Sequence, residues 1–230
     1  PLAGVIFAME VVLREYTVAG FAPVILAAVS ATAVARWAYG AAPTFTVPVL
    51  AGAGHLSELP WMLATGLVIG ALAAGYNFLL GRFTGALTSV PVWARISLGG
   101  LGAGACAFFV PQVMGIGYDT VNAELVGGLG LGLLVTIAVV KLLATTFGLG
   151  MGLPGGMIGP TLVIGAAAGG AMGMAAQGIT PQYVSSPALY TVIGMGAMMS
   201  ATLQAPLSAL TAMLELTGDP NIILPGLLTV

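Results

Sequence analysis

Long apolar runs separated by short polar segments dominate the hydropathy pattern of this chain. Each run approaches or exceeds the length that crosses the hydrocarbon core of a bilayer, about 20 residues. They run from Val18 to Val34, Trp61 to Leu80, Ile96 to Val110, Val126 to Phe147, Met157 to Met174 and Tyr190 to Leu214. Gln204-Ala205-Pro206 interrupts the last run and several others are short, so the pattern predicts tilted and discontinuous membrane helices.

The polar connections between these runs carry an uneven distribution of charge. They cover residues 40–60, 82–95, 113–125, 148–156 and 177–188. If the apolar segments alternate across the membrane, one side holds Arg14, Arg82 and Arg95. The other side holds Glu58, Asp119 and Glu124, with Arg36 nearby. The positive-inside rule then predicts that the arginine-rich side faces the cytoplasm.

Composition leads to the same class of protein. Hydrophobic residues make up 59% of the chain and charged residues 5%, against about 25% charged in soluble domains. Such a chain has too little charge to cover a soluble surface, so we expect an integral membrane protein. Glycine is abundant, with 35 copies, and the pairs Gly66/Gly70 and Gly165/Gly169 are predicted to be helix-packing contacts.

The same counts argue against several functions. Five basic residues and a net charge of -2 cannot form a nucleic-acid footprint, so no nucleic-acid partner is predicted. One histidine and one cysteine predict no metal cluster and no disulfide framework, and we expect His55 to be a solvated loop residue. No cofactor is predicted. An intramembrane enzyme is disfavoured because paired aspartates and a serine–histidine constellation are missing from the apolar segments.

An internal repeat relates the beginning and the end of the chain. Residues 1–11 align without gaps to residues 206–216, and each copy opens with Pro-Leu followed by small residues. In each copy a glutamate, Glu10 or Glu215, stands nine positions after the proline. Proline suits the first turn of a helix. Two explanations stay open: a chance match between apolar helices, or the paired-repeat plan of transporters, whose broken helices meet near the bilayer midplane.

The most informative segment is the glycine-rich stretch over residues 148–160. It reads Gly-Leu-Gly-Met-Gly-Leu-Pro-Gly-Gly-Met-Ile-Gly-Pro, and an apolar helix is predicted from Thr161. Glycines allow the backbone to approach a ligand closely, and the new helix offers unpaired N–H groups and the positive end of its dipole. A dehydrated anion is therefore the expected ligand. The alternative is that the glycines serve helix packing alone.

These residues resemble the CLC family of chloride channels and chloride/proton antiporters. In that family a Gly-x-Phe-x-Pro motif opens a pore-lining helix, and a helix that carries lysine or arginine precedes it. The similar segments here are Gly152–Pro160 for the motif and Lys141-Leu142-Leu143-Ala144-Thr145-Thr146 for the preceding helix. Residues 1–10 resemble its helix H, 204–217 its helix P and 222–225 the start of its helix Q. The resemblance implies an all-α integral membrane protein with tilted and broken transmembrane helices in an inverted-repeat CLC-type architecture. Residues 1–230 would form a partial transmembrane domain, with the end of the first repeat and most of the second, truncated at both ends.

The resemblance also implies an anion site built from backbone amides. In the family, N–H groups at the start of the motif helix coordinate a dehydrated chloride. Carried over position by position, these groups belong to Gly156, Met157 and Ile158, and Gly159 and Pro160 complete the motif. Ile158 stands where the family usually has phenylalanine, which affects the local shape of the pore.

Two further positions bear on mechanism. Proton-coupled members often carry a second glutamate after the one at Glu10; here that proton-relay position is Val11, which is not ionisable. This favours chloride transport by passive conduction, with a chloride/proton antiporter or another inverted-repeat anion transporter as the alternatives. We expect Glu10 to be structural, satisfied at a helix end. Lys141 has two open interpretations: it raises the positive potential near the pore, or it snorkels to the cytoplasmic interface.

The resemblance finally implies a partner and a location. In the family, helices H, I, P and Q form a dimer interface, which predicts a homodimer through residues 1–10, 17–38, 205–217 and 221–230. Chloride and membrane lipid are the other expected partners, in the cell (inner) membrane. The family's serine-bearing helix, gating glutamate and last-helix tyrosine lie outside the sequence, so we expect that this stretch alone does not conduct.

Overall fold

Helices account for all the secondary structure in the part of the chain that the computed structural model describes, residues 1–14, 16–42, 44–45, 47, 56–86, 88–184 and 186–230. His55 lies outside these residues. By length and composition, the helices that can cross a membrane are α2 (Val18–Tyr39), α3 (Leu59–Ala86), α4 (Val92–Phe109), α6 (Leu131–Gly150) and α7 (Ile158–Ile179). The all-α membrane fold predicted from the apolar runs is therefore confirmed.

Shorter helices complete the fold. They are α1 (Leu2–Phe7), which continues into a π-helical turn over Ala8–Leu13, and α5 (Tyr118–Leu125), α8 (Pro187–Leu203), α9 (Pro206–Thr217) and α10 (Ile223–Thr229). The break predicted within residues 190–214 is present. Gln204 adopts a left-handed conformation with φ 55°, and Pro206 opens α9 at a position where its missing N–H costs nothing.

Helix α5 lies where the sequence predicts only a polar connection. Its apolar residues Val121 and Leu125 are buried, four positions apart and thus on one face of the helix. The next membrane helix starts at Leu131 rather than at Val126, because the intervening turn contains three glycines and bends at Gly127, where φ is 76°. Eight residues with a mixed polar pattern are too short for hydropathy alone to separate a helix from a loop.

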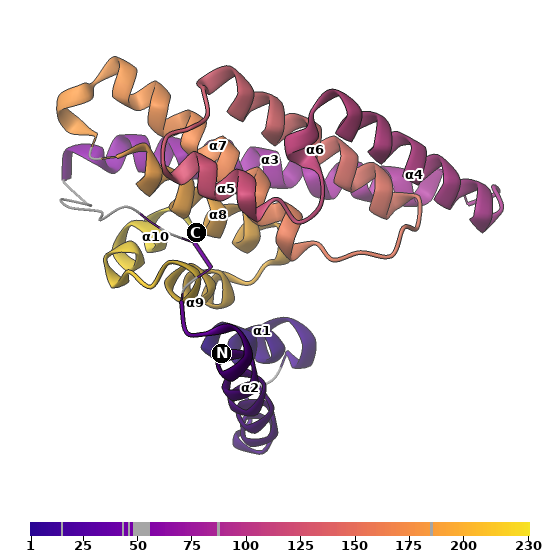
Figure 1. Cartoon of the computed structure of the whole chain (residues 1–230), viewed down its shortest axis with the longest axis horizontal. Coiled ribbons are helices and arrows are strands. Elements are labelled where there is room, and N and C mark those ends of the chain that lie inside the picture. Colours follow the sequence, from indigo (N-terminus) through magenta and orange to yellow (C-terminus); the bar gives the residue numbers. More distant parts are fainter. Residues whose placement is uncertain (15, 43, 46, 48–55, 87, 185) are drawn as a thin grey trace.

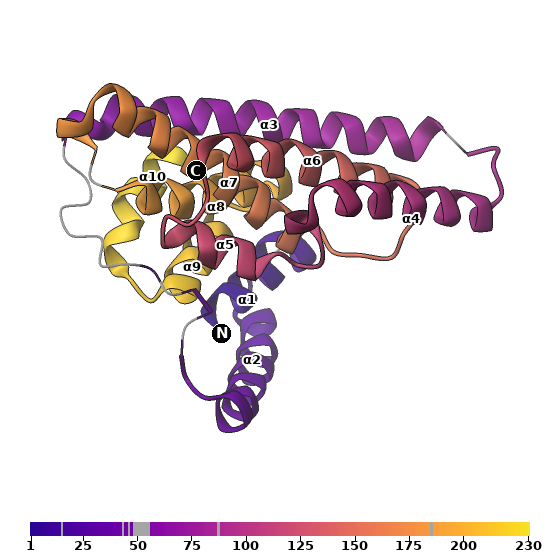
Figure 2. The ribbon, with the colours of Figure 1, turned by 45° about the horizontal axis from the view of Figure 1, so that its top comes forward.

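The centre of the molecule is the pair α7 and α8, which pack against each other more extensively than any other two helices described. Gly165 and Gly169 lie against the backbone carbonyls of Gly194 and Tyr190, and a Cβ at either glycine would overlap these atoms. Figure 2 shows α3 running along one side of this pair. The packing role predicted for Gly165 and Gly169 is confirmed, whereas the prediction is wrong for Gly70, which faces open space.

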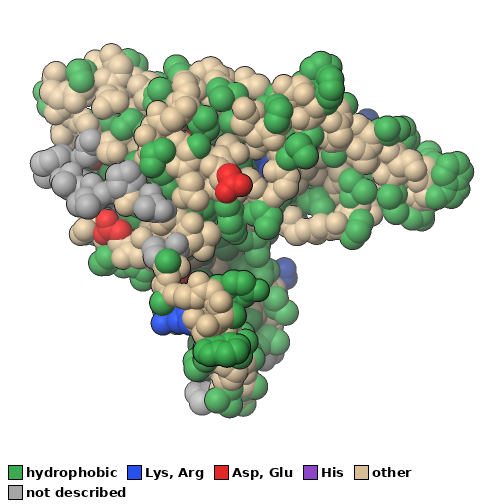
Figure 3. Space-filling model, viewed as in Figure 1, with side chains coloured by type: hydrophobic (Ala, Val, Ile, Leu, Met, Phe, Trp, Pro, Cys, Tyr) green, Lys and Arg blue, Asp and Glu red, His purple; other side chains and the backbone are tan. Residues whose placement is uncertain are grey.

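The first two helices stand apart from this centre. Figure 1 shows α2 projecting below the rest of the molecule, while α1 packs on α9. Much of the surface is apolar (Figure 3), including the exposed side chains of Trp37, Trp93 and Phe108. Such a surface suits contact with lipid. Two acidic residues of the predicted polar connections, Glu58 and Glu124, are buried, so fewer charges bear on the orientation than the sequence implies.

Candidate functional site

The candidate anion site is the first turn of α7. The preceding chain closes α6 with hydrogen bonds from Gly152 N to Leu149 O (2.9 Å) and from Leu153 N to Gly148 O (3.1 Å). Gly152 has φ 90°, a left-handed conformation that glycine adopts without strain. The chain then runs without regular structure to Met157. The glycines thus end one helix and lead directly into the next.

The N–H groups at this helix start are unpaired within the helix. The first helical hydrogen bond runs from Thr161 N to Met157 O, at 3.0 Å. The N–H groups of Met157, Ile158 and Gly159 therefore precede the regular ladder, Pro160 has none, and α7 has no side-chain cap in the described chain. Backbone donors aligned with the positive end of a 22-residue helix attract an anion.

An open cavity adjoins this helix start. It has a volume of about 630 Å³, and its lining includes Ile158 and Leu162 of α7, Tyr118 of α5 and Met199 of α8. Two charged side chains also line it, Arg36 near the end of α2 and Glu215 of α9. Of the predicted residues, Ile158 lines this cavity. Gly156 is exposed and Met157 is half-buried in the segment just before it.

Lys141 is buried in α6, with 3% of its surface exposed. Its Nζ donates hydrogen bonds to the carbonyl oxygens of Val113 and Gly115, both at 2.7 Å. The interpretation that Lys141 snorkels to the interface is therefore wrong, because the ammonium group is held inside the protein. A charged donor suits two carbonyls that the turn leaves without helical partners.

The turn that Lys141 holds packs beside the first turn of α7. Ile116 lies between Gly115 and the start of α5, and its Cγ2 would be 3.1 Å from a Cβ built on Gly159. Gly117 similarly leaves room for Val163 of α7. Lys141 is therefore placed to fix the segment that packs on the first turn of α7. The sequence marks Lys141 as unusual but cannot show its carbonyl partners, which lie 26 and 28 residues away.

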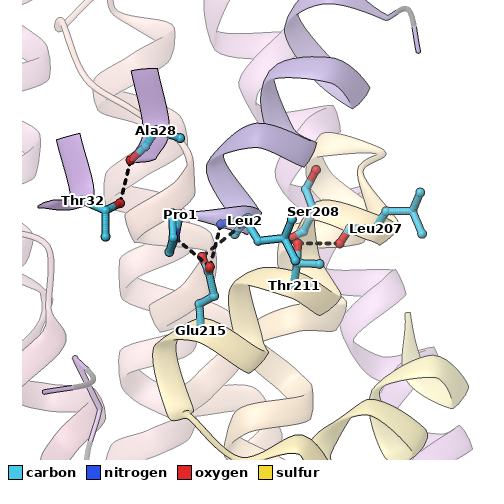
Figure 4. Close-up of polar contacts among 9 residues, drawn as sticks. Pro1, Leu2, Ala28, Thr32, Leu207, Ser208, Thr211 and Glu215 are labelled. Carbon is cyan, nitrogen blue, oxygen red and sulfur yellow. Dashed lines mark hydrogen bonds and ion pairs between the residues drawn. The ribbon is translucent and has the colours of Figure 1, made fainter. Parts of the chain in front are cut away.

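Glu10 and Glu215 cap each other's helices. Glu10 accepts hydrogen bonds from the N–H groups of Leu207 (3.2 Å) and Ser208 (2.8 Å) at the start of α9. Glu215 accepts from Leu2 (2.6 Å) and Ala3 (3.1 Å) at the start of α1. Figure 4 shows the Glu215 carboxylate directed at the first residues of α1. The structural role predicted for Glu10 is confirmed. Its neighbour Val11 lies in the π-helical turn and is partly exposed.

The fold and the site together define a multi-pass membrane protein in which paired short helices and an uncapped helix start surround an open cavity. A sequence profile described as voltage gated chloride channel matches residues 1–230. The chain therefore belongs to the voltage-gated chloride channel family.

Curated relatives agree with this assignment. The chain is 34% identical over 233 residues to a putative chloride channel protein ClcB-like of Ralstonia nicotianae, with 99% of this chain and 53% of the relative covered. It is 30% identical over 243 residues to the H(+)/Cl(-) exchange transporter ClcA of Salmonella paratyphi B, with 100% of this chain and 50% of the relative covered. The chain thus spans about half the length of the curated relatives it matches.

Solved structures share the fold. A slow cyanobacterial Cl-/H+ antiporter superposes with a TM-score of 0.82 at 23% identity, over 100% of this chain and 55% of that one. A CLC-type fluoride/proton antiporter gives a TM-score of 0.81 at 17% identity, over 100% and 57%. The CLC-type architecture expected from the sequence is therefore confirmed.

Proposed function

We propose that the complete protein carries chloride across a bacterial inner membrane, and that the backbone amides of Gly156, Met157 and Ile158 form part of its anion path. The observation that carries this proposal is the uncapped start of α7, where Ile158 lines a cavity of about 630 Å³. Backbone donors carry only partial charges, so they can bind a dehydrated chloride weakly enough for it to leave again.

We further propose that transport is exchange with protons rather than passive conduction. The sequence-based preference for a channel depended on Val11, which cannot carry a proton. The relatives weigh against that preference: the Salmonella protein is named an H(+)/Cl(-) exchange transporter, although the Ralstonia protein is named a putative chloride channel. If this protein exchanges protons, they must pass Val11 by another group or by water.

A homodimer through residues 1–10, 17–38, 205–217 and 221–230 also belongs to this proposal. These segments expose large apolar side chains, among them Leu26, Leu207 and Leu224, the last with 75% of its surface exposed. Apolar residues gathered on α2, α9 and α10 suit either lipid or a second copy of the protein. Transport, and not catalysis, is the activity proposed for the complete protein.

Flux through the complete protein, purified and reconstituted in liposomes, tests these proposals. Chloride and pH gradients are imposed separately. We expect a chloride gradient to move protons against their own gradient. Passive chloride flow that does not depend on the pH gradient would favour a channel over an exchanger. No chloride movement in either experiment would contradict chloride transport itself.

A further inference from the structure

The structure buries a carboxyl group that the proposed anion path does not use. Glu124, in the last turn of α5, has 7% of its surface exposed. Its Oε1 accepts a hydrogen bond of 2.8 Å from the hydroxyl of Thr191 in α8. The same oxygen lies against the backbone of α7 at Gly170, where any side chain would collide with it. The carboxyl group of this α5 residue therefore touches two other helices, α7 and α8.

No positive charge compensates Glu124 in the described surroundings. Helix α7 carries no titratable side chain, nor does the turn over residues 126–130, and α8 carries only Tyr190, which interacts electrostatically with Glu58. Tyr118 and Asp119 stand at the opposite end of α5. Lys141 of α6 is held at the carbonyls of Val113 and Gly115. A buried carboxylate without a cation is costly, and binding a proton removes that cost.

A cavity gives this carboxyl group a place from which to exchange a proton. Its volume is about 190 Å³, and besides Glu124 and Thr191 its lining includes Gln177, Met174 and Leu134. A water molecule takes up about 30 Å³, so the space admits several. Glu124, Thr191 and the amide of Gln177 supply polar groups that water requires.

We propose that Glu124 and this cavity form a proton-binding site, distinct from the candidate anion site at the start of α7. Its ligand is a single proton, taken up by the carboxylate from water in the cavity. The neutral carboxylic acid is the form that suits the close packing of α5 on α7 and α8, and the charged form loosens it.

The position of Glu124 on α5 links this site to the anion cavity. The same short helix carries Tyr118 at its first residue, and Tyr118 lines the cavity in front of Ile158. Eight helical residues span about 12 Å, so a shift of α5 on proton release reaches the wall of that cavity. This consequence, unlike proton binding itself, rests on the proposed transport function.

Infrared difference spectroscopy of the purified complete protein tests the site directly, without any transport measurement. The carbonyl stretch of a protonated buried carboxyl group is followed while pH is raised from about 5 to about 9, a range centred on neutrality. We expect a band that disappears with a midpoint near neutral pH. The band must be missing in Glu124→Gln and unchanged in Asp119→Asn, which alters an exposed carboxyl group of the same helix.

A second variant tests the geometry rather than the presence of the carboxyl group. Thr191→Val removes the hydroxyl that donates to Glu124 and leaves the side-chain volume nearly unchanged. Since that hydrogen bond favours the charged form, its loss should move the midpoint upward by about one pH unit, while Thr191→Ser should leave it in place. No neutral-range band in the wild type, or a band that survives Glu124→Gln, would overturn the proposal.

Transport supplies the remaining readout. If the band behaves as expected, the pH dependence of chloride flux in liposomes should be flatter for Glu124→Gln than for Asp119→Asn and the wild type. An unchanged flux profile would contradict the link through α5 and leave proton binding established. If neither the wild type nor the variants transport chloride, the proposed function is wrong. The infrared result still shows whether Glu124 binds a proton.

Discussion

Glu10 and Glu215 are related by a pseudo-twofold arrangement in which each caps the helix that begins the other's repeat. Each stands nine residues after a proline, Pro1 or Pro206. Each accepts hydrogen bonds from the two residues that follow the other copy's proline. A chance match between apolar helices predicts no such reciprocity, so the repeat in the sequence reflects paired, antiparallel helices.

Loss of this reciprocal cap should weaken the contact between α1 and α9. Glu10→Ala and Glu215→Ala each remove two acceptors from a helix start, which should cost about 1–2 kcal/mol of stability. Thermal unfolding of the complete protein in detergent measures the effect. Asp119→Asn, which removes an exposed charge elsewhere, is the matched control, and equal midpoints for all four proteins would contradict the capping role.

Close packing of α7 on α8 should depend on Gly169. A Cβ at this position meets the carbonyl of Tyr190, so Gly169→Ala should force the helices apart and cost about 1–3 kcal/mol. Gly178→Ala, on the same helix but facing open space, should be neutral or slightly stabilising, because alanine is the better helix former. Equal thermal midpoints for Gly169→Ala and Gly178→Ala would contradict the packing role of Gly169.

Lys141 should hold the turn that packs on the first turn of α7. Lys141→Met leaves the carbonyls of Val113 and Gly115 without their donor, and we expect faster hydrogen exchange in residues 113–118 and a stability loss of about 1–3 kcal/mol. Lys141→Arg keeps the charge but not the compact ammonium group. Its exchange rate and stability should lie between those of the wild type and Lys141→Met. Unchanged exchange in Lys141→Met would show that the two hydrogen bonds do not position this segment.

Stability should fall as pH rises through neutrality, because of Glu124. Burial raises the pKa of this carboxyl group from 4.5 to about 7, with the Thr191 hydrogen bond acting in the opposite direction. A carboxyl group whose pKa is raised on folding contributes most to stability when the pH is below its pKa in the unfolded chain. This contribution is lost as the pH rises to its pKa in the folded protein, and here the loss is at most about 3 kcal/mol. Unfolding midpoints measured from pH 5 to pH 8, roughly the range over which such a shift acts, should decline in the wild type and decline less in Glu124→Gln. An equal slope in both proteins would assign the decline to other groups.

Hydropathy and glycine placement were enough to predict the membrane helices, the break before Pro206 and the uncapped start of α7. These features depend on local sequence: apolar length, a proline at a helix start, and glycines before an apolar run. The structural role of Glu10 at a helix end could also be predicted, since a glutamate in a short apolar helix must find donors, but its exchange of caps with Glu215 could not.

Tertiary neighbours determined what the sequence could not show. Glu124 lies in a segment with polar composition, and only the packing of α5 against Gly170 and Thr191 shows that it is buried. The partners of Lys141 are backbone carbonyls, which every residue possesses, so residue types give no sign of them. For Gly70 the sequence predicted a packing contact that the structure does not have, because glycine spacing alone does not say which face of a helix meets a neighbour.

One substitution can decide whether backbone N–H groups at the start of α7 bind chloride. Met157→Pro removes an N–H group at a residue whose φ is -89°, about 25° from the value of about -65° that proline requires. Met157→Ala changes the side chain and keeps the N–H. Calorimetric titration of the purified complete protein with chloride should give similar affinities for the wild type and Met157→Ala, and an affinity at least about tenfold weaker for Met157→Pro. Equal affinity in Met157→Pro and the wild type would contradict the account.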